Sequence, residues 1–406
     1  MNITYKIRER GAVSIFIVIF TALLVTVVTT SFVQIMLRNQ QQASNNDLSQ
    51  SAYDSAMAGV EDAKRALVAL KKCQRLAAPG NACDNLRLAL ANRGDECEIL
   101  GDNANVNIGV TFNNGEVQVG DPSLNQAYTC VKVAVQTSSY NGALIDQDDT
   151  VVIPLLPVGD PNAVTAVRIS WYTQADLPQG SSTASIPVGT DLPRFNKWGK
   201  LKGDGTYEYN SPPIMRAQLM QFAKGKDIAL QDFSGAAARS RFLYPNINGT
   251  NTLLSGSFED DARRASTNSV LAGGCKANFN YGGYACSVEL ALPAMTGTDV
   301  REAYLQLAAL YNQDTVHYKV ELLDGIGATD VVQFDNVQPE VDSTGRASDL
   351  FRRVKARVTV SPSGTPLPFP EAPVTTKDLC KEFFITNNPD DYNGDGNGDS
   401  DTCSPS

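Results

Sequence analysis

The feature that most constrains this chain is an apolar run of 26 residues, from Ala12 to Leu37, without a charged side chain. A secretory signal has an apolar region of about 7 to 15 residues, and a cleavage site of small residues follows it. A helix that crosses the hydrocarbon layer of a membrane needs about 20 apolar residues. The run therefore predicts a transmembrane helix rather than a signal peptide.

The residues before the run predict its orientation. Lys6, Arg8 and Arg10 directly precede it, and positively charged residues mark the cytoplasmic side of a membrane helix. The N-terminus is therefore expected in the cytoplasm of a single-pass membrane protein, with everything from Arg38 onward exported. By itself this pattern is also typical of a plain membrane anchor.

The helix is expected to continue beyond the membrane. Pro79 is the first proline of the chain, and Gly59 is the only glycine between the apolar run and Pro79. The pattern predicts one helix over residues 12–72, about 90 Å long, with a transmembrane half at 12–37 and an amphipathic half at 38–72. In the second half, apolar residues recur at steps of three and four along one helix face, namely Leu48, Ala52, Ala56, Val60, Ala63, Leu67 and Leu70.

The leader and this helix resemble a type IV prepilin, in which a short basic leader ending in glycine directly precedes an apolar helix. The stretch "AYDSAMAGVEDA" at 52–63 is similar to a small-residue-rich segment of PilX-type minor pilins. The resemblance covers about residues 6–70. It implies that residues 1–11 are a leader, which prepilin peptidase removes between Gly11 and Ala12. It also implies partners: other pilin subunits and the pilus assembly machinery.

One position departs from the major pilins. Those proteins carry a glutamate at the fifth position of the mature chain, where it pairs with the N-terminal amine of a neighbouring subunit. With Ala12 as the first mature residue, this chain has Phe16 at that position. An unpaired carboxylate in lipid is costly, so Phe16 favours storage in the membrane but removes the pairing contact. The departure is similar to low-copy subunits at a fibre tip.

The expected function is therefore a minor, tip-located subunit of a type IV pilus or a related pseudopilus, which is carried on the surface fibre. The alternative is a surface adhesin or binding protein that stays anchored in the membrane. The formal net charge is -10, and the 34 lysines and arginines are scattered along the chain. This distribution argues against a nucleic-acid partner, which needs a clustered basic face.

The cysteines indicate an oxidising compartment. All eight follow the apolar run, none forms a CxxC pair, and the single histidine cannot complete a zinc site. Their spacing suggests pairs of neighbours, including one at the end of the long helix and one that flanks the loop "KANFNYGGYA", although spacing alone leaves the connectivity open. The candidates are Cys73 with Cys83, Cys97 with Cys130, Cys275 with Cys286, and Cys380 with Cys403.

The expected fold class is α+β, with the long helix carrying a β-rich head. Residues 73–156 are expected to form a small α+β, pilin-like region. It would begin with a short helix near 81–94, and the "FNNGE" stretch at 112–116 is a hairpin turn signal. Strands are expected where apolar residues alternate, at 106–112, 115–120 and 129–137.

A second domain is expected at 157–362, because prolines and a glycine at 154–163 interrupt the strand pattern. Its short strands, separated by turn residues, suggest a β-sandwich. Residues 363–406 would follow as a proline-rich linker and an acidic tail bracketed by cysteines. The strands are expected at 164–173, 213–222, 285–293, 303–311, 316–323, 330–337 and 353–360.

The sequence indicates no enzyme. It contains no GxSxG, HExxH, P-loop or dinucleotide-binding motif. His317 stands on an expected strand without a nucleophile motif, which favours a structural role. Trp171 is expected in the core. Trp198 lies in a loop-like stretch and is the better ligand candidate, although a packed loop anchor is favoured there too.

The acidic tail carries the one site-like motif. Its oxygen-bearing residues alternate as in the first nine positions of an EF-hand calcium loop, and Gly396 stands at position 6. Position 12 is Thr402 where a glutamate is usual, and Asp401 stands beside it. The alternative is a disordered acidic tail, because the same residue types favour disorder. The predicted calcium ligands are Asp391, Asn393, Asp395, Asn397 and Asp399.

Overall fold

The computed structural model describes most of the chain between residues 12 and 359. The description covers residues 12–74, 80–120, 125–145, 149–186, 200–201, 207–208, 210–223, 238–247, 253–260, 270–294, 300–310 and 315–359.

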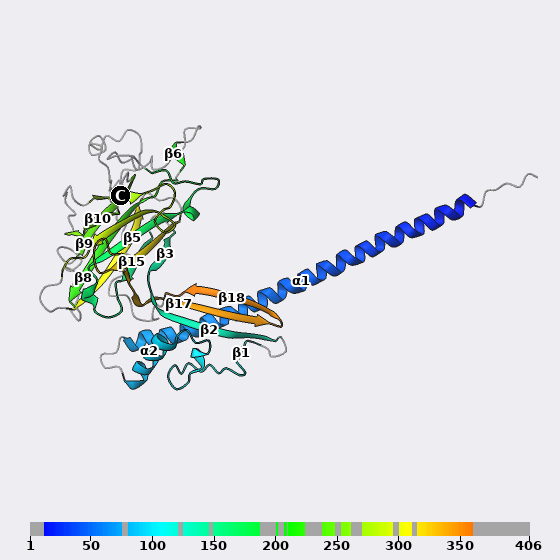
Figure 1. Ribbon diagram of the computed structural model, residues 1–406, viewed down its shortest axis with the longest axis horizontal. Helices are drawn as coiled ribbons and strands as arrows, with labels where there is room; N and C mark the ends of the chain where they lie inside the picture. The colour runs from blue at the N-terminus through cyan, green and yellow to red at the C-terminus, as the bar shows by residue number, and fades with distance from the viewer. Residues whose placement is uncertain are drawn as a thin grey trace, which may run out of the picture. The chain divides into compact units, whose positions relative to one another are not determined.

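One helix, α1, runs without interruption over 63 residues, Ala12–Gln74 (Figure 1). This confirms the expected helix at 12–72. Lys71 and Lys72 lie in its last turn, where positive charge is favourable beside the helix C-terminus. A second helix, α2 (Asn81–Arg93), follows, and the disulfide Cys73–Cys83 joins the two.

The chain divides into two compact units that interleave along the sequence. The first contains Met1–Ala66, Asp95–Lys132 and Val341–Ala356, and the second contains Leu67–Gly94, Val133–Glu340 and Arg357–Ser406. These bounds differ from the expected division of the head into regions at 73–156 and 157–362. The two units are described separately below.

A small sheet has the strand order β1-β2-β17-β18. Its strands are β1 (Val117–Gln118), β2 (Gln126–Thr137), β17 (Phe334–Ala347) and β18 (Leu350–Arg357). The expected alternation in β2 is confirmed, because Val131, Val133 and Val135 are buried while Lys132 is exposed.

The hairpin turn before β1 is also confirmed. Asn113 and Glu116 exchange backbone hydrogen bonds of 2.8 and 3.2 Å. Between them Asn114 and Gly115 have φ of 52° and 81°, as a two-residue hairpin turn of type I′ requires.

The strand expected at 106–112 is wrong. These residues lie in turns and loop, because Asn107 and Gly109 adopt φ of 43° and 75°, which a strand does not accommodate. The apolar residues that suggested a strand, Val106 and Val110, are each only 4% exposed. Both side chains are buried although the segment that carries them is irregular.

Within the described residues, the second unit contains a sheet of 12 strands. Its main path is β16-β15-β5-β13-β12-β9-β8-β14-β4, while β3 pairs with β15, β10 with β13, and β11 with β9. Its strands are β3 (Tyr140–Leu144), β4 (Thr150–Pro154), β5 (Ala166–Thr173), β8 (Ile214–Ala223), β9 (Ala238–Ile247), β10 (Leu254–Ser257), β11 (Glu259–Asp260), β12 (Val270–Cys275), β13 (Tyr284–Ala291), β14 (Arg301–Leu310), β15 (Val316–Leu323) and β16 (Val331–Val332). A separate pair joins β6 (Lys200–Leu201) to β7 (Tyr207–Glu208).

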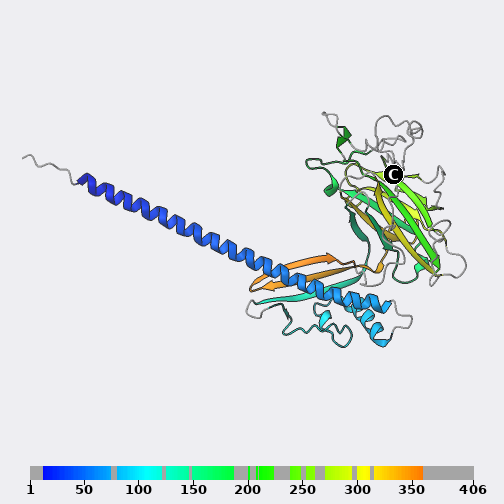
Figure 2. The same cartoon turned by 180° about the vertical axis from the view of Figure 1, so that it is seen from behind.

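This sheet is barrel-like (Figure 2), so the expected β-sandwich is not confirmed, whereas the expected α+β class with a β-rich head is. Two of its pairings, β10 with β13 and β12 with β9, are parallel. Strands on both sides of the proline-rich stretch 154–163 belong to it, since β4 precedes that stretch and β5 follows it. The prolines therefore end a strand without ending the unit.

The core of the large sheet follows from alternation along its strands. In β14 every second side chain, from Ala303 to Ala309, is buried, and the residues between them are half-buried. Trp171 on β5 is 0% exposed, and its indole nitrogen donates a hydrogen bond of 3.0 Å to the carbonyl oxygen of Pro213. Trp171 is thus a core residue, as expected.

Candidate functional site: the N-terminal helix and the small sheet

The first part of α1 has an apolar and fully exposed surface. Every described side chain from Ile15 to Leu37 is exposed, and the mean hydropathy of its most apolar window of 18 residues is 2.5. Within the described residues, α1 is the one helix long and apolar enough to cross a membrane. Because exposed apolar surface of this extent is unfavourable in water, this half of α1 is suited to lipid.

Hydroxyl groups in this segment are satisfied within the helix itself. Thr21, Thr26 and Thr30 donate hydrogen bonds of 2.8 to 3.0 Å to carbonyl oxygens four residues earlier. A polar group without a partner costs several kcal/mol in hydrocarbon. These internal bonds therefore make a threonine-containing helix compatible with a membrane.

The processing site predicted from the resemblance lies at the start of α1. Gly11 is outside the described residues, and Ala12 is the first residue of the helix. The side chain of Phe16 is 75% exposed, and neither aspartate nor glutamate occurs between Ala12 and Leu37. The apolar half of the helix therefore offers no carboxylate to a neighbouring amine.

The second part of α1 is buried on one face by small side chains. Ala52, Ala56 and Ala63 are 0% exposed, and Val60 is 4% exposed, so the expected apolar face is confirmed. In the first unit, called the small unit below, this face packs against the sheet that contains β2 and β17 (Figure 1). Alanines at these positions bring the helix axis close to the strands.

Two glycines allow α1 and the small sheet to approach each other closely. A Cβ atom on Gly59 would overlap Ser343 of β17 and Val131 of β2. A Cβ atom on Gly345 of β17 would overlap the backbone of Ala52 and Ala56. A glycine within a strand often marks a place where another backbone comes near, and here that backbone belongs to α1.

A hydrogen bond between two side chains ties the helix to the sheet. The hydroxyl of Tyr128, on β2, donates to a carboxylate oxygen of Asp62 over 2.6 Å. Asp62 also pairs with Arg65, one turn later on α1. Burial raises the pKa of Tyr128, and the hydrogen bond to Asp62 raises it further. The ring of Phe112 packs edge-on against Tyr128, with centroids 5.8 Å apart.

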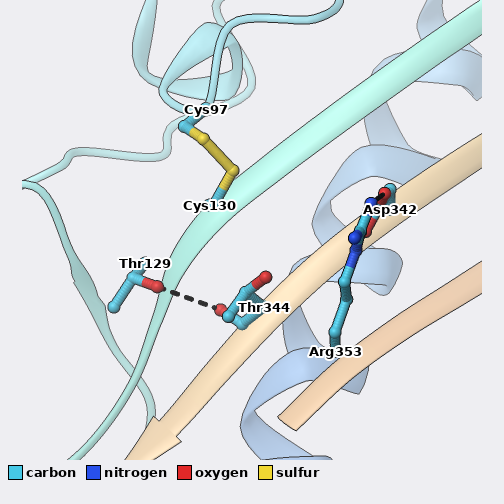
Figure 3. Close-up of a disulfide and its surroundings, with 6 residues drawn as sticks. All are labelled: Cys97, Thr129, Cys130, Asp342, Thr344 and Arg353. Atoms are coloured by element: carbon cyan, nitrogen blue, oxygen red, sulfur yellow. Dashed lines mark hydrogen bonds and ion pairs between the residues drawn. A yellow bond between two sulfur atoms is a disulfide. The ribbon is translucent and has the colours of Figure 1, made fainter. Parts of the chain in front are cut away.

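A disulfide and two ion pairs hold the rest of the small unit together, and Figure 3 shows the disulfide and the pair between Asp342 and Arg353. The disulfide Cys97–Cys130 ties the segment that precedes β1 to β2. Arg346 binds Glu116 over 2.7 Å, and Arg353 of β18 pairs with Asp342 of β17. The hydrogen bond from Arg353 lowers the pKa of the Asp342 carboxyl.

Three of the four candidate cysteine pairs form disulfides: Cys73–Cys83, Cys97–Cys130 and Cys275–Cys286. Cys380 and Cys403 lie outside the described residues. So do Trp198 and the predicted calcium ligands Asp391, Asn393, Asp395, Asn397 and Asp399.

His317 lies beside a buried carboxylate. Its Nδ1 contacts the carboxylate of Asp176, and its backbone nitrogen donates to that carboxylate over 3.1 Å. Asp176, whose side chain is fully buried, also accepts hydrogen bonds from the backbone and hydroxyl of Thr173. The carboxylate thus links the end of β5 to β15.

Comparison with known protein families finds no family model that matches this chain, and a search of curated proteins finds no match either.

The residues of β2 and β17 that contact α1 are not evident from the sequence. Tyr128, Ser343 and Gly345 were not singled out, although Gly345 in a β-compatible context is a recognisable signal of close backbone approach. Which element would approach could not be read from the strand itself, because Gly345 and Ala52 are nearly 300 residues apart in sequence, at positions 345 and 52.

Proposed function

We propose that this protein is a minor subunit of a type IV pilus or a related pseudopilus, stored in the membrane and assembled through α1. The observation that carries the proposal is a single helix with two different surfaces. Its first part, 15–37, is apolar and exposed, and its second part packs through alanines and glycine on a small sheet. A protein that moves from a membrane into a fibre needs both surfaces on one rigid element.

The order of the strands supports separate roles for the small sheet and the large sheet. β2 and β17 are neighbours in the small sheet, yet residues 138–333, which include the strands β3 to β16, lie between them in the chain. The small unit is thus continuous in space and interrupted in sequence by the larger one. In the proposed function the helix and small sheet serve assembly, and the large sheet is the part displayed at the surface.

Phe16 supports a position at the fibre tip. A subunit at the tip needs no carboxylate for the amine of a further subunit above it, whereas subunits within the shaft do. An apolar side chain there also lowers the cost of storage in lipid. The three disulfides support export to an oxidising compartment.

The test is processing of the leader. Gly11→Leu should leave the leader attached and keep the protein out of sheared fibres, whereas the matched variant Gly11→Ala keeps a small residue before the cut and should be processed. Intact mass of the membrane-extracted protein separates the two outcomes. If Gly11→Leu is processed like the wild type, or if the wild type keeps its leader and stays in the membrane, the permanent anchor is the better account.

We further propose that the tail binds one calcium ion through Asp391, Asn393, Asp395, Asn397 and Asp399. Crowded carboxylates repel one another, and a divalent cation with oxygen ligands relieves that repulsion. Since the ion stabilises only the ordered form, the tail of the full chain should resist protease with calcium and not with chelator. Asp395→Ala should abolish this protection and Asp390→Ala should not. Equal cleavage with and without calcium would contradict the proposal.

A further inference from the structure

Between its apolar half and the half that packs on the small sheet, α1 contains a segment, residues 38–47, that is exposed on all sides. Every side chain of this segment is exposed, and none forms a hydrogen bond or an ion pair with a described residue. The first hydrogen bond between α1 and the small sheet lies just beyond it, where Nε of Arg352 donates to the hydroxyl of Ser49 over 2.8 Å. Figures 1 and 2 show no other described helix or strand beside α1 before it reaches the small sheet. The segment therefore depends on its own backbone hydrogen bonds.

The two neighbouring parts of α1 resist opening for different reasons. In hydrocarbon a released backbone N–H or C=O group finds no partner, which keeps residues 15–37 helical. The part from Ala52 to Ala66 is buried against the sheet, and packing of one face supplies most of the stability of helices in proteins. Residues 38–47 have water around them, where released backbone groups bind water instead. The helix α1 therefore opens at the lowest cost in this segment.

The sequence at the end of the segment is suited to a helix start. Residues 44–47 read "SNND", and serine, asparagine and aspartate favour helix ends over helix interiors because their side chains bind the backbone. Ser44 and Asp47 have the spacing of a capping box, and the apolar face of the second half begins at Leu48. If the helix opened at Ser44, its hydroxyl could accept the backbone N–H of Asp47, and the Asp47 carboxylate could accept the backbone N–H of Ser44. The negative charge would also lie at the positive end of the new helix.

We propose that α1 exchanges between the continuous helix and a form interrupted at Ser44, in which Ser44 and Asp47 cap the second part. In the interrupted form the part packed on the small sheet turns while the apolar half stays in lipid. The continuous form is the rigid element that assembly requires. The exchange itself does not depend on the proposed function, because a permanent anchor with this sequence would open at the same place.

Amide hydrogen exchange of the full chain in detergent micelles tests the proposal. The paired substitution Ser44→Ala and Asp47→Ala removes the cap and favours the continuous helix. Amides of residues 44–47 should then exchange about tenfold more slowly than in the wild type. The control pair, Asn39→Ala and Gln42→Ala, changes exposed residues that are helical in both forms and should leave this exchange unchanged. Ser44→Thr keeps a capping hydroxyl and should behave as the wild type does.

A proline substitution provides the interrupted form for comparison. Asn45→Pro places proline at the first position of the second part, where a helix accepts it, whereas the interior of a continuous helix does not. Spin labels at Val33 and Glu61 are about 42 Å apart along a continuous helix. The distance distribution from pulsed EPR should be narrow and near that value with Ser44→Ala and Asp47→Ala. With Asn45→Pro it should be broad and extend to shorter distances.

Three results would overturn the proposal. The first is equal exchange at 44–47 in the wild type and in the variant without the cap, which would mean that the helix does not open at Ser44. The second is equal slowing by the control pair, which would indicate fraying along the whole segment. The third is the same narrow distance distribution in Asn45→Pro and in the variant without the cap. Exchange from Ala52 to Ala66 should be the same in all variants, because this part stays packed.

Discussion

The two halves of α1 have nearly the same backbone and opposite surroundings. From Ile15 to Leu37 large apolar side chains are exposed, whereas from Ala52 to Ala66 small side chains are buried against a sheet. The large side chains of the first half gain by leaving water for any apolar medium. The small ones of the second half matter because of what they allow, which is close approach of two backbones. The same helix therefore tolerates different changes in its two halves.

The largest expected effect is in the first half. Val25 is 60% exposed, and Val25→Lys would place a charge in lipid at a cost of about 3 kcal/mol. The membrane-inserted fraction, measured by resistance to alkaline carbonate extraction, should fall sharply. Glu61→Lys, an exposed position in the second half, should leave insertion unchanged. Insertion of Val25→Lys at the wild-type level would show that this half does not depend on lipid.

The contact between the second half of α1 and the sheet should be destabilised even by the addition of a single methyl group. Gly345→Ala places a Cβ atom against the backbone of Ala52 and Ala56, where neither side can move easily. Overpacking of this kind costs about 2 to 3 kcal/mol, which denaturant unfolding of the small unit would reveal. The control is Gly80→Ala, because a Cβ atom there meets nothing within 4 Å. Equal stability of the two variants would contradict the close helix–sheet contact.

Removal of a polar contact in the second half of α1 should have a smaller effect on the free energy of unfolding. Tyr128→Phe removes the hydrogen bond to Asp62 and leaves the ring in place. A hydrogen bond to a charged group contributes about 1.5 kcal/mol or more, so the free energy of unfolding should fall by about that amount. In a double-mutant cycle with Asp62→Asn, the two losses should not add. Additive losses would mean that the two side chains do not interact.

The smallest effect concerns pH at the edge of the sheet. The hydrogen bond from Arg353 lowers the pKa of Asp342. The stabilisation is therefore complete above the ordinary carboxyl pKa of about 4 and is lost as the pH falls through the lowered value. Asp342→Asn should slightly lower the free energy of unfolding at pH 7, because the pair is lost, and its difference from the wild type should shrink as the pH falls below 4. An unchanged acid transition in that variant would assign the sensitivity to other carboxyls.

Local patterns predicted the elements that depend on local physics. The proline-free stretch and the three-and-four spacing from Leu48 to Leu70 were sufficient for α1, and alternation was sufficient for β2 and β15. β9 (Ala238–Ile247) was missed because Arg239, Arg241 and Pro245 interrupt an apolar alternation. β17 was predicted only up to residue 337, since Pro339 and Gly345 resemble turn residues.

The arrangement of the elements could not be predicted in this way. β2 and β17 are neighbours although residues 138–333 separate them, and no periodicity in either strand specifies a partner so distant. Likewise the resemblance at 52–63 identified the small residues of α1 but not their partners. Gly345 and Tyr128 complete that contact from two segments more than 200 residues apart, at positions 345 and 128.

N-terminal sequencing of the native protein, combined with its location, is the most direct test of the central claim that α1 is stored in a membrane and then assembled. If α1 is stored in a membrane and then assembled, the mature chain begins at Ala12 and a fraction of it is recovered in sheared surface fibres. A chain that retains Met1 and is found only in the membrane would show instead that α1 is a permanent anchor.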